Sequence, residues 1–251
     1  MRVANFQVAV AFEIEPELIL SLGPSIRALA TRTQGRIHDA GVGDPDFPPD
    51  VPRIVIQTKQ FLVNISLNRF DIHATPPRHL QENHSAAVQF AQTVAGDVLN
   101  ELLKVPVSYA WSGIVAHLKY PSEKPLASAP MAVAPIFQHL VNIPHSGKPL
   151  SSFEVRFGYQ EDDLFRSIKL GGYAAQNIKF KPIPEGEQTA PGIGIEGTEI
   201  VETGVQVFLD VNNKPSAGKK TPIDDLKRLF DVCEKSIVTL PEELDLKELL
   251  K

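Results

Sequence analysis

The stretch that most constrains the fold is a long amphipathic segment followed at once by a strand-forming one, across residues 79–120. From Ser85, apolar residues recur at the three- and four-residue spacing of one helix face. These positions are Ala87, Phe90, Ala91, Val94, Ala95, Val98 and Leu102. Pro106 forbids further helix, and residues 107–120 favour a strand. A helix with one apolar face must pack on a surface, so we predict that it lies on a β-sheet.

Alternation of apolar and polar residues predicts the other strands of the first 120 residues. The predicted strands are residues 6–14, 53–58, 61–67 and 70–74, with a hairpin tip at 58–60. A helix opens after Glu15, and Gly23-Pro24 inside it predicts a kink or a split into two short helices. Residues 35–52 are dense in Gly, Pro and Asp, which predicts a surface loop.

Residues 121–149 are rich in Pro and small residues and predict a connector with one short helix near 135–141. Beyond it, alternation predicts strands at 153–159, 164–170 and 173–181, and a last strand around 205–211. Gly171-Gly172 predicts a bulge or turn, and residues 181–197 predict a long loop. Thr221-Pro222-Ile223-Asp224 predicts a helix start, and Pro241 predicts that helix's end.

These elements predict an α+β fold of mostly antiparallel strands, with helices packed on one face of the sheet. We place the boundary between two loosely similar halves in the connector. The predicted organisation is therefore 1–120, a connector at 121–149, and 150–251.

Composition excludes several functional classes. The net charge of −5 gives no overall attraction for a phosphate backbone, so nucleic acid is not expected as a partner. No window approaches the roughly 18 apolar residues of a membrane span, and no secretory signal is visible. The single cysteine, Cys233, excludes an intrachain disulfide and a cysteine-based zinc site. We expect a soluble cytoplasmic protein.

The residues with the strongest potential for chemistry are His38, Asp39, Asp71 and His73. His38 and Asp39 open the Asp-rich 35–52 loop, where carboxylates and an imidazole could share a cation or a proton. Asp71 and His73 lie two residues apart on a predicted strand, so their side chains should point to the same face. Turn chemistry explains the first pair and solvated positions at the end of an element explain the second, and both explanations are favoured over metal binding or catalysis.

Well-marked catalytic and cofactor motifs are absent from the sequence. Residues 192–197 read G-x-G-x-x-G, but a proline precedes them and a strand follows, so a loop is favoured over a phosphate site. There is no nucleophile elbow, P-loop, HExxH or kinase motif. No cofactor and no bound metal are expected, and no enzyme class is indicated.

The chain resembles a sporadically distributed family of uncharacterised bacterial α+β proteins of this size. The resemblance rests on the segments 61–64 (FLVN), the helix leading into 107–120, 208–211 (FLDV), 236–239 (SIVT) and an acidic tail. It departs from the family at Trp111-Ser112-Gly113-Ile114, where an arginine- and asparagine-rich strand is usual. The resemblance implies an α+β fold and carries over no activity and no site.

Three functions fit these observations. The first is a non-enzymatic binding or protein-interaction module of the bacterial cytoplasm. The second is a metal-assisted hydrolase or transferase that uses carboxylates and histidines from residues 38–50 and 71–84. The third is a homo-oligomeric structural subunit that associates through strand edges or the last helix.

Overall fold

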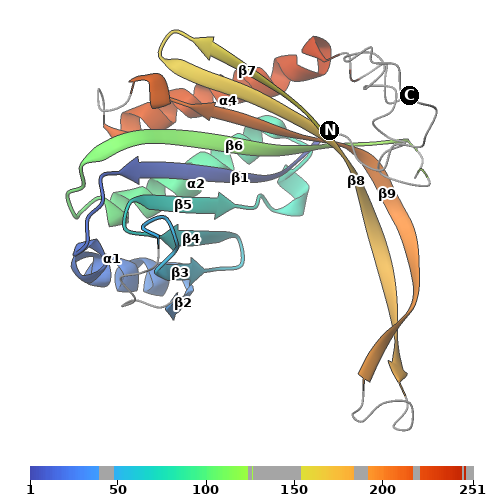
Figure 1. Cartoon of the computed structure of the whole chain (residues 1–251), viewed down its shortest axis with the longest axis horizontal. Coiled ribbons are helices and arrows are strands. Elements are labelled where there is room, and N and C mark those ends of the chain that lie inside the picture. Colours follow the sequence, from blue (N-terminus) through green and yellow to red (C-terminus); the bar gives the residue numbers. More distant parts are fainter. Residues whose placement is uncertain are drawn as a thin grey trace. The chain divides into compact units, whose positions relative to one another are not determined.

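The computed structural model contains a nine-stranded sheet and three α-helices within the residues that it describes, which are 1–39, 48–123, 126, 154–183, 192–216, 221–244 and 246 (Figure 1). The strands are β1 (Arg2–Phe12), β2 (Arg36–Asp39), β3 (Ile54–Gln57), β4 (Phe61–Ile65), β5 (Arg69–Ala74), β6 (Tyr109–Pro121), β7 (Glu154–Glu161), β8 (Leu164–Ile183) and β9 (Gly192–Asn212). The helices are α1 (Leu18–Thr33), α2 (His84–Leu102) and α4 (Pro222–Glu243), with short 3-10 turns η1 (Arg78–Leu80) and η2 (Lys214–Ser216). The predicted α+β class is confirmed.

The strand order in the sheet is β2-β3-β4-β5-β1-β6-β9-β8-β7. The sheet is mostly antiparallel, as expected, and the register is defined from β2 through β1. Ile56 pairs with Val63, which pairs with Ile72, which pairs with Val8, so one continuous row crosses four strands. All four side chains are buried, because cross-strand partners share a face.

The chain forms two compact units, each drawing on separate segments. The larger unit comprises Met1–Leu118, Arg156–Lys169 and Val207–Leu240, and the smaller comprises Lys119–Val155, Leu170–Gln206 and Pro241–Lys251. This division does not confirm two similar sequential halves, since strands and a helix from the last 100 residues belong to the larger unit.

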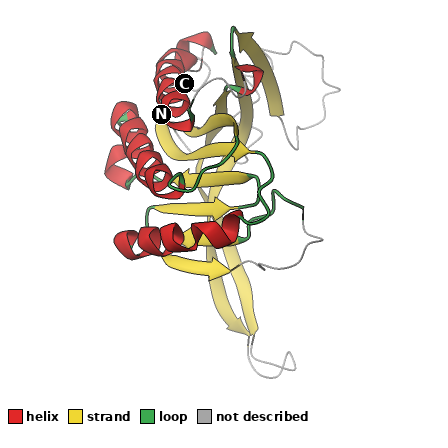
Figure 2. Ribbon diagram, turned by 90° about the vertical axis from the view of Figure 1, so that its left-hand side faces the viewer, coloured by secondary structure: helices red, strands yellow, loops and turns green. Residues whose placement is uncertain are grey.

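In the larger unit the helices lie on one face of the sheet (Figure 2). The strands turn alternate apolar side chains to that face, and the largest of these are completely buried. Examples are Phe6, Phe70, Ile72, Ile114, Leu118, Val207 and Leu209. The α2 stripe is buried as predicted, apart from Phe90, which is half-buried. This layer is the main hydrophobic core.

Of the two outcomes predicted for Gly23-Pro24, a kink or a split, the split is wrong, because α1 runs without a break from Leu18 to Thr33 with Pro24 inside it. Proline removes one backbone donor, but burial of Leu22, Ile26 and Leu29 on the same side holds the helix together. The helix ends at Gln34, whose backbone is left-handed with φ 54°.

Other element boundaries also differ from the sequence prediction. The 35–52 loop contains strand β2, which pairs along its whole length with β3, from Arg36↔Gln57 to Asp39↔Ile54. β8 continues through Gly171-Gly172, so there is no turn there, and β9 already begins at Gly192 inside the expected loop. α4 extends past Pro241 to Glu243. The predicted connector helix at 135–141 lies outside the described residues.

The smaller unit is built on β8 and β9, joined at one end by the last residues of β6. Backbone N–H groups of Ser122 and Leu126 donate to Thr203, through its carbonyl oxygen at 2.9 Å and its side-chain oxygen at 2.8 Å. Gly204 has no room for a side chain, since an added Cβ would collide with the Tyr120 carbonyl oxygen and the Pro121 Cα. A glycine is therefore required where β9 crosses the end of β6.

Candidate functional site

Asp71 and His73 lie on β5, on the face of the sheet opposite the helices. Their neighbours Phe70, Ile72 and Ala74 are fully buried on the helix side, so the predicted sharing of one face is confirmed. Asp71 is buried and accepts hydrogen bonds from Arg69 Nε at 2.7 Å and from the Gln7 side chain at 3.3 Å. This carboxylate is therefore fully engaged by a cation and an amide.

His73 is half-buried beside this pair, and its Nε2 lies 3.5 Å from the Asn64 side-chain nitrogen. Burial lowers the pKa of His73, Asp71 opposes that effect, and Arg69 reinforces it. The imidazole is consequently neutral near pH 7. It offers hydrogen bonding rather than a positive charge.

The structure does not bring His38 and Asp39 to Asp71 and His73. His38 pairs with Val55, Val55 with Asn64, and Asn64 with Asp71. Three strand intervals of about 4.8 Å put His38 roughly 14 Å from Asp71, although both side chains face the same way. Asp39 is the next residue of β2, and its side chain lies outside the described residues. The four residues do not share one set of metal ligands.

Within the described part of the chain, no group of three or more His, Cys, Asp or Glu side chains could hold a metal ion. A catalytic role for any of the four candidates stays a prediction.

A second set of contacts lies on the same face of the sheet, the one opposite the helices, which we call the open face. The Asn5 side chain on β1 lies 3.5 Å from His117 Nδ1 on β6, and the His117 ring stacks on Phe208 of β9 with centroids 4.4 Å apart. Lys169 Nζ on β8 lies 5.6 Å from the centre of the same Phe208 ring. One polar and aromatic ladder therefore links four strands.

The most extensive polar cluster is internal. Asn213 donates from its side chain to Asp225 at 2.7 Å and to the Tyr109 hydroxyl oxygen at 3.0 Å, while the Tyr109 hydroxyl donates to Asp225 at 2.9 Å. Ser112 donates its backbone N–H to the Asn213 side-chain oxygen at 2.7 Å. Burial raises the pKa of Tyr109 to about 12. Because Asn213 and Asp225 are almost fully buried, this network joins α4 to the sheet and is not a reactive site.

Cys233 is equally inert. It is completely buried in α4, and burial raises the pKa of its thiol to about 12. The thiolate is the nucleophilic form, so Cys233 packs as a small hydrophobe, as the sequence predicts.

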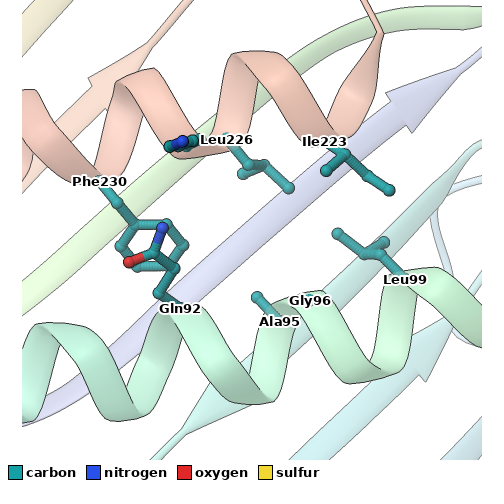
Figure 3. Close-up of a pocket in the computed structure, with 8 residues that line it drawn as sticks. Gln92, Ala95, Gly96, Leu99, Ile223, Leu226 and Phe230 are labelled. Atoms are coloured by element: carbon teal, nitrogen blue, oxygen red, sulfur yellow. The ribbon is translucent and has the colours of Figure 1, made fainter.

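A hollow in the helical layer lies between α2 and α4 (Figure 3). The two helices run antiparallel, because Ser85 at the start of α2 bonds Glu234 late in α4, whereas Leu99 near the end of α2 lies by Ile223 at the start of α4. The groove has a volume of about 160 Å³. Its lining residues are Gln92, Ala95, Gly96, Leu99, Ile223, Leu226, Lys227 and Phe230.

The groove exists because small residues of α2 stand opposite large ones of α4. An added Cβ at Gly96 would meet no atom within 4 Å, so the missing side chain leaves open space. In Figure 3, Ile223 and Leu99 point toward each other across the gap, and Phe230 lies beside Gln92. Ile223 is 45% exposed although it is apolar, and this exposure marks the open end of the groove.

Charges around the groove are mainly acidic. On α4, Asp224 and Asp231 each directly follow a lining residue and are exposed. Lys227 is a basic lining residue, while nearby Arg228 is held by Asp163 in a two-pronged ion pair with both contacts at 2.5 Å. These charges form the rim of the groove, and they favour a basic ligand.

The sequence prediction missed this groove, because both helices read as ordinary amphipathic helices. The available signals were Gly96, beside the apolar stripe of its helix, and Ile223, two residues after the Thr221 cap, although Ile223 also fits the apolar stripe of its own helix. Neither signal identifies the partner helix.

No protein-family model matches the sequence, no curated protein is significantly similar to it, and no solved structure matches the fold. Among the described residues, no helix is long and apolar enough to cross a membrane.

Proposed function

We propose that this protein is a non-enzymatic binding protein that holds a basic segment of a protein partner through the groove between α2 and α4. The observation that carries the proposal is an apolar, side-chain-deficient groove with an acidic rim. A groove of this size is smaller than the roughly 300–1,000 Å³ of small-molecule pockets, so it suits one large apolar side chain. Helices commonly recognise partners in this way, by setting apolar anchors into a groove between helices.

The rim defines the chemistry of the partner. Asp224 and Asp231 of α4 would flank the anchor, so Lys or Arg beside a Leu or Phe is the complementary pattern. The protein's net charge of −5 favours the same partner at longer range. We place this activity in the bacterial cytoplasm.

The metal-assisted hydrolase or transferase stays a less supported alternative. It would need ligands besides Asp71 and His73, because Asp71 is already bound by Arg69 and Gln7. No further candidate among the described residues supplies them.

The experiment uses a fluorescent amphipathic peptide with Leu at helical spacing and Lys elsewhere, and a matched peptide with Glu in place of Lys. Anisotropy titrations should show binding of the Lys peptide alone, weakened by salt. Gly96→Leu fills the groove and should weaken binding by about tenfold or more. Gly23→Leu, at a half-buried glycine inside α1, is the control and should bind as the wild type does.

Lys227→Glu provides an independent check, since it makes the rim more acidic without filling the groove. The Lys peptide should then bind more tightly. The proposal is wrong if the Lys peptide does not bind the wild-type protein, or if Gly96→Leu and Gly23→Leu bind it equally well.

A further inference from the structure

β2 forms one edge of the sheet, and its outer side has no neighbouring strand among the described residues (Figure 1). Successive residues of an antiparallel strand turn their backbone groups to alternate sides. At the turn from β3 to β4, the Thr58 N–H bonds the Phe61 carbonyl oxygen, so Thr58 turns to β4 and Gln57 turns to β2. Gln57 pairs with Arg36, and Ile37 is the next residue of β2. Ile37 therefore presents its backbone N–H and C=O outward.

A hollow of about 500 Å³ lies beside this edge, between β2 and the second half of α1. Its lining residues are Arg27, Ala30, Thr31, Gln34, Gly35 and Ile37. Ile37 belongs to the helix side of the sheet, because its partner Ile56 is fully buried there, yet Ile37 is 44% exposed. A free edge beside an exposed apolar side chain is a template for a further strand, which would cover Ile37.

The charges at this edge are basic, although the whole chain carries a net charge of −5. Residues 18–38 contain three arginines and no carboxylate, and Asp39 is the next acidic residue. Arg32 is turned to α2, where it bonds a backbone carbonyl oxygen at 3.0 Å. Arg27 and Arg36 are both exposed, and Arg27 lines the hollow on the helix side, whereas Arg36 of β2 points to the open face. A strand added here would meet a cation on each of its faces.

We propose that β2 pairs with an extended acidic segment of a protein partner. The backbone of the segment bonds the outward N–H and C=O of Ile37, in the manner of peptides that add a strand to a sheet edge. Successive side chains of the segment point to opposite faces, so an apolar side chain covers Ile37 in the hollow and carboxylates meet Arg27 and Arg36. This site is separate from the α2–α4 groove and selects the opposite charge.

Charge and backbone chemistry favour this occupant over two others. Two copies of β2 that pair about a two-fold axis through Ile37 set Arg36 of each copy opposite His38 of the other, which brings basic side chains together. A nucleic acid carries the complementary charge but has no peptide groups to continue the ladder. An acidic peptide supplies both the charge and the peptide groups.

A short fluorescent peptide of Val, Thr and Glu tests the proposal, with a matched peptide that has Lys in place of Glu. Anisotropy titrations should show binding of the Glu peptide alone. A third peptide, N-methylated at two consecutive central residues, lacks a backbone donor on each edge and should bind about tenfold more weakly, because ladder bonds are lost. The proposal is wrong if the Glu peptide does not bind, or if N-methylation leaves its affinity unchanged.

Two variants locate the site on the protein. Ile37→Pro removes the outward N–H, a change that an edge strand tolerates, and should weaken binding of the Glu peptide by about tenfold. Arg27→Glu should weaken it by about threefold to tenfold. Lys235→Glu, at an exposed lysine of α4, changes the net charge equally and should have little effect. Equal effects of Arg27→Glu and Lys235→Glu would overturn the proposal.

Gly96→Leu, which fills the α2–α4 groove, should bind the Glu peptide as the wild type does, so a failure of this proposal is distinguishable from a failure of the proposed function. Sedimentation velocity of the free protein checks the competing occupant, because a reversible dimer changes its apparent mass with concentration. If the wild type forms a dimer that Ile37→Pro dissociates, a second copy occupies the edge and the proposal is wrong.

Discussion

The two faces of the sheet in the larger unit use the same strands in different ways. On the helix side, Phe6 of β1 is fully buried and meets Phe230 of α4 edge to face, with ring centroids 6.5 Å apart. On the opposite side, half-buried Phe208 of β9 stacks on His117 and lies under Lys169. One face is closed by packing, and the other carries separate polar and aromatic pairs.

The difference shows where this molecule can change without losing its fold. Buried apolar side chains stabilise through area removed from water and through close packing, so each replacement leaves a cavity. Cross-strand pairs on a half-exposed face contribute about 1 kcal/mol or less each. Stability therefore resides on the helix side, and single side chains on the open face can vary at small cost.

The largest expected effect on stability comes from replacing the two phenylalanines, Phe6 and Phe208. Phe6→Ala should lower the free energy of unfolding by about 3–5 kcal/mol, because it empties a fully buried site. Phe208→Ala should lower it by only about 1–2 kcal/mol, since it removes a half-buried ring and its stacking partner. Chemical denaturation measures both. Equal losses would contradict the proposed division between the faces.

The second test concerns the hydrogen-bond network that joins α4 to the sheet, because it buries polar groups on the helix side. Asp225→Ala should cost about 2–4 kcal/mol, since it leaves the Asn213 amide and the Tyr109 hydroxyl without their buried acceptor. Its chain neighbour Asp224 is exposed and bonds only within the Thr221 cap, so Asp224→Ala should cost about 1 kcal/mol or less. Thermal and urea unfolding of the pair distinguish the two positions.

The corresponding carboxylate on the open face is Asp71. Asp71→Ala should cost about 1–2 kcal/mol, because the half-buried Arg69 loses its partner. A double-mutant cycle with Arg69→Ala isolates the pair, and its coupling should be near 1 kcal/mol. If this coupling energy were as large as the loss expected for Asp225→Ala, side-chain pairs on the open face would stabilise the fold as much as buried ones on the helix side.

Local sequence patterns are sufficient to predict the elements whose stability depends on one buried stripe. The alternation of β1, the stripe of α2 and the Thr221 cap are each encoded within a few neighbouring residues, and each was predicted correctly apart from small shifts at the ends. The hairpin tip at 58–60 is also present, with the Thr58 hydroxyl oxygen accepting from the Phe61 N–H at 2.9 Å.

Elements that depend on distant partners were not predictable in this way. β2 has too few residues to show a pattern and exists because β3 pairs with it. α1 continues through Pro24 because its buried side chains outweigh a local helix breaker. The Tyr109–Asp225 contact joins residues 116 positions apart, and the groove needs α2 and α4 side by side. No local pattern records such pairings.

Two glycine substitutions test whether there is open space beside α2. Gly96→Ala should raise the free energy of unfolding by about 0.5–1 kcal/mol, because alanine favours a helix and its Cβ would enter open space. Gly35→Ala should lower it, since its Cβ would stand 3.1 Å from Ile56 and 3.2 Å from Thr58. If Gly96→Ala destabilised the protein, the groove would not be the open space described above.

The smallest effect is the pH dependence contributed by His73 on the open face. Burial lowers the pKa of His73 in the folded protein, so the unfolded chain binds the proton first as the pH falls below about 6.5. Protonation then favours the unfolded state, and stability declines with falling pH until the folded protein also takes up the proton.

His73→Gln removes this term, so the variant should lose less stability than the wild type between about pH 7.5 and pH 5.5. His79→Gln, at an exposed histidine of η1, should show the wild-type dependence. The comparison of slopes cancels the other titrating groups, which all three proteins share. A steeper loss in His73→Gln would mean that Asp71 outweighs burial and that His73 is charged on the folded open face.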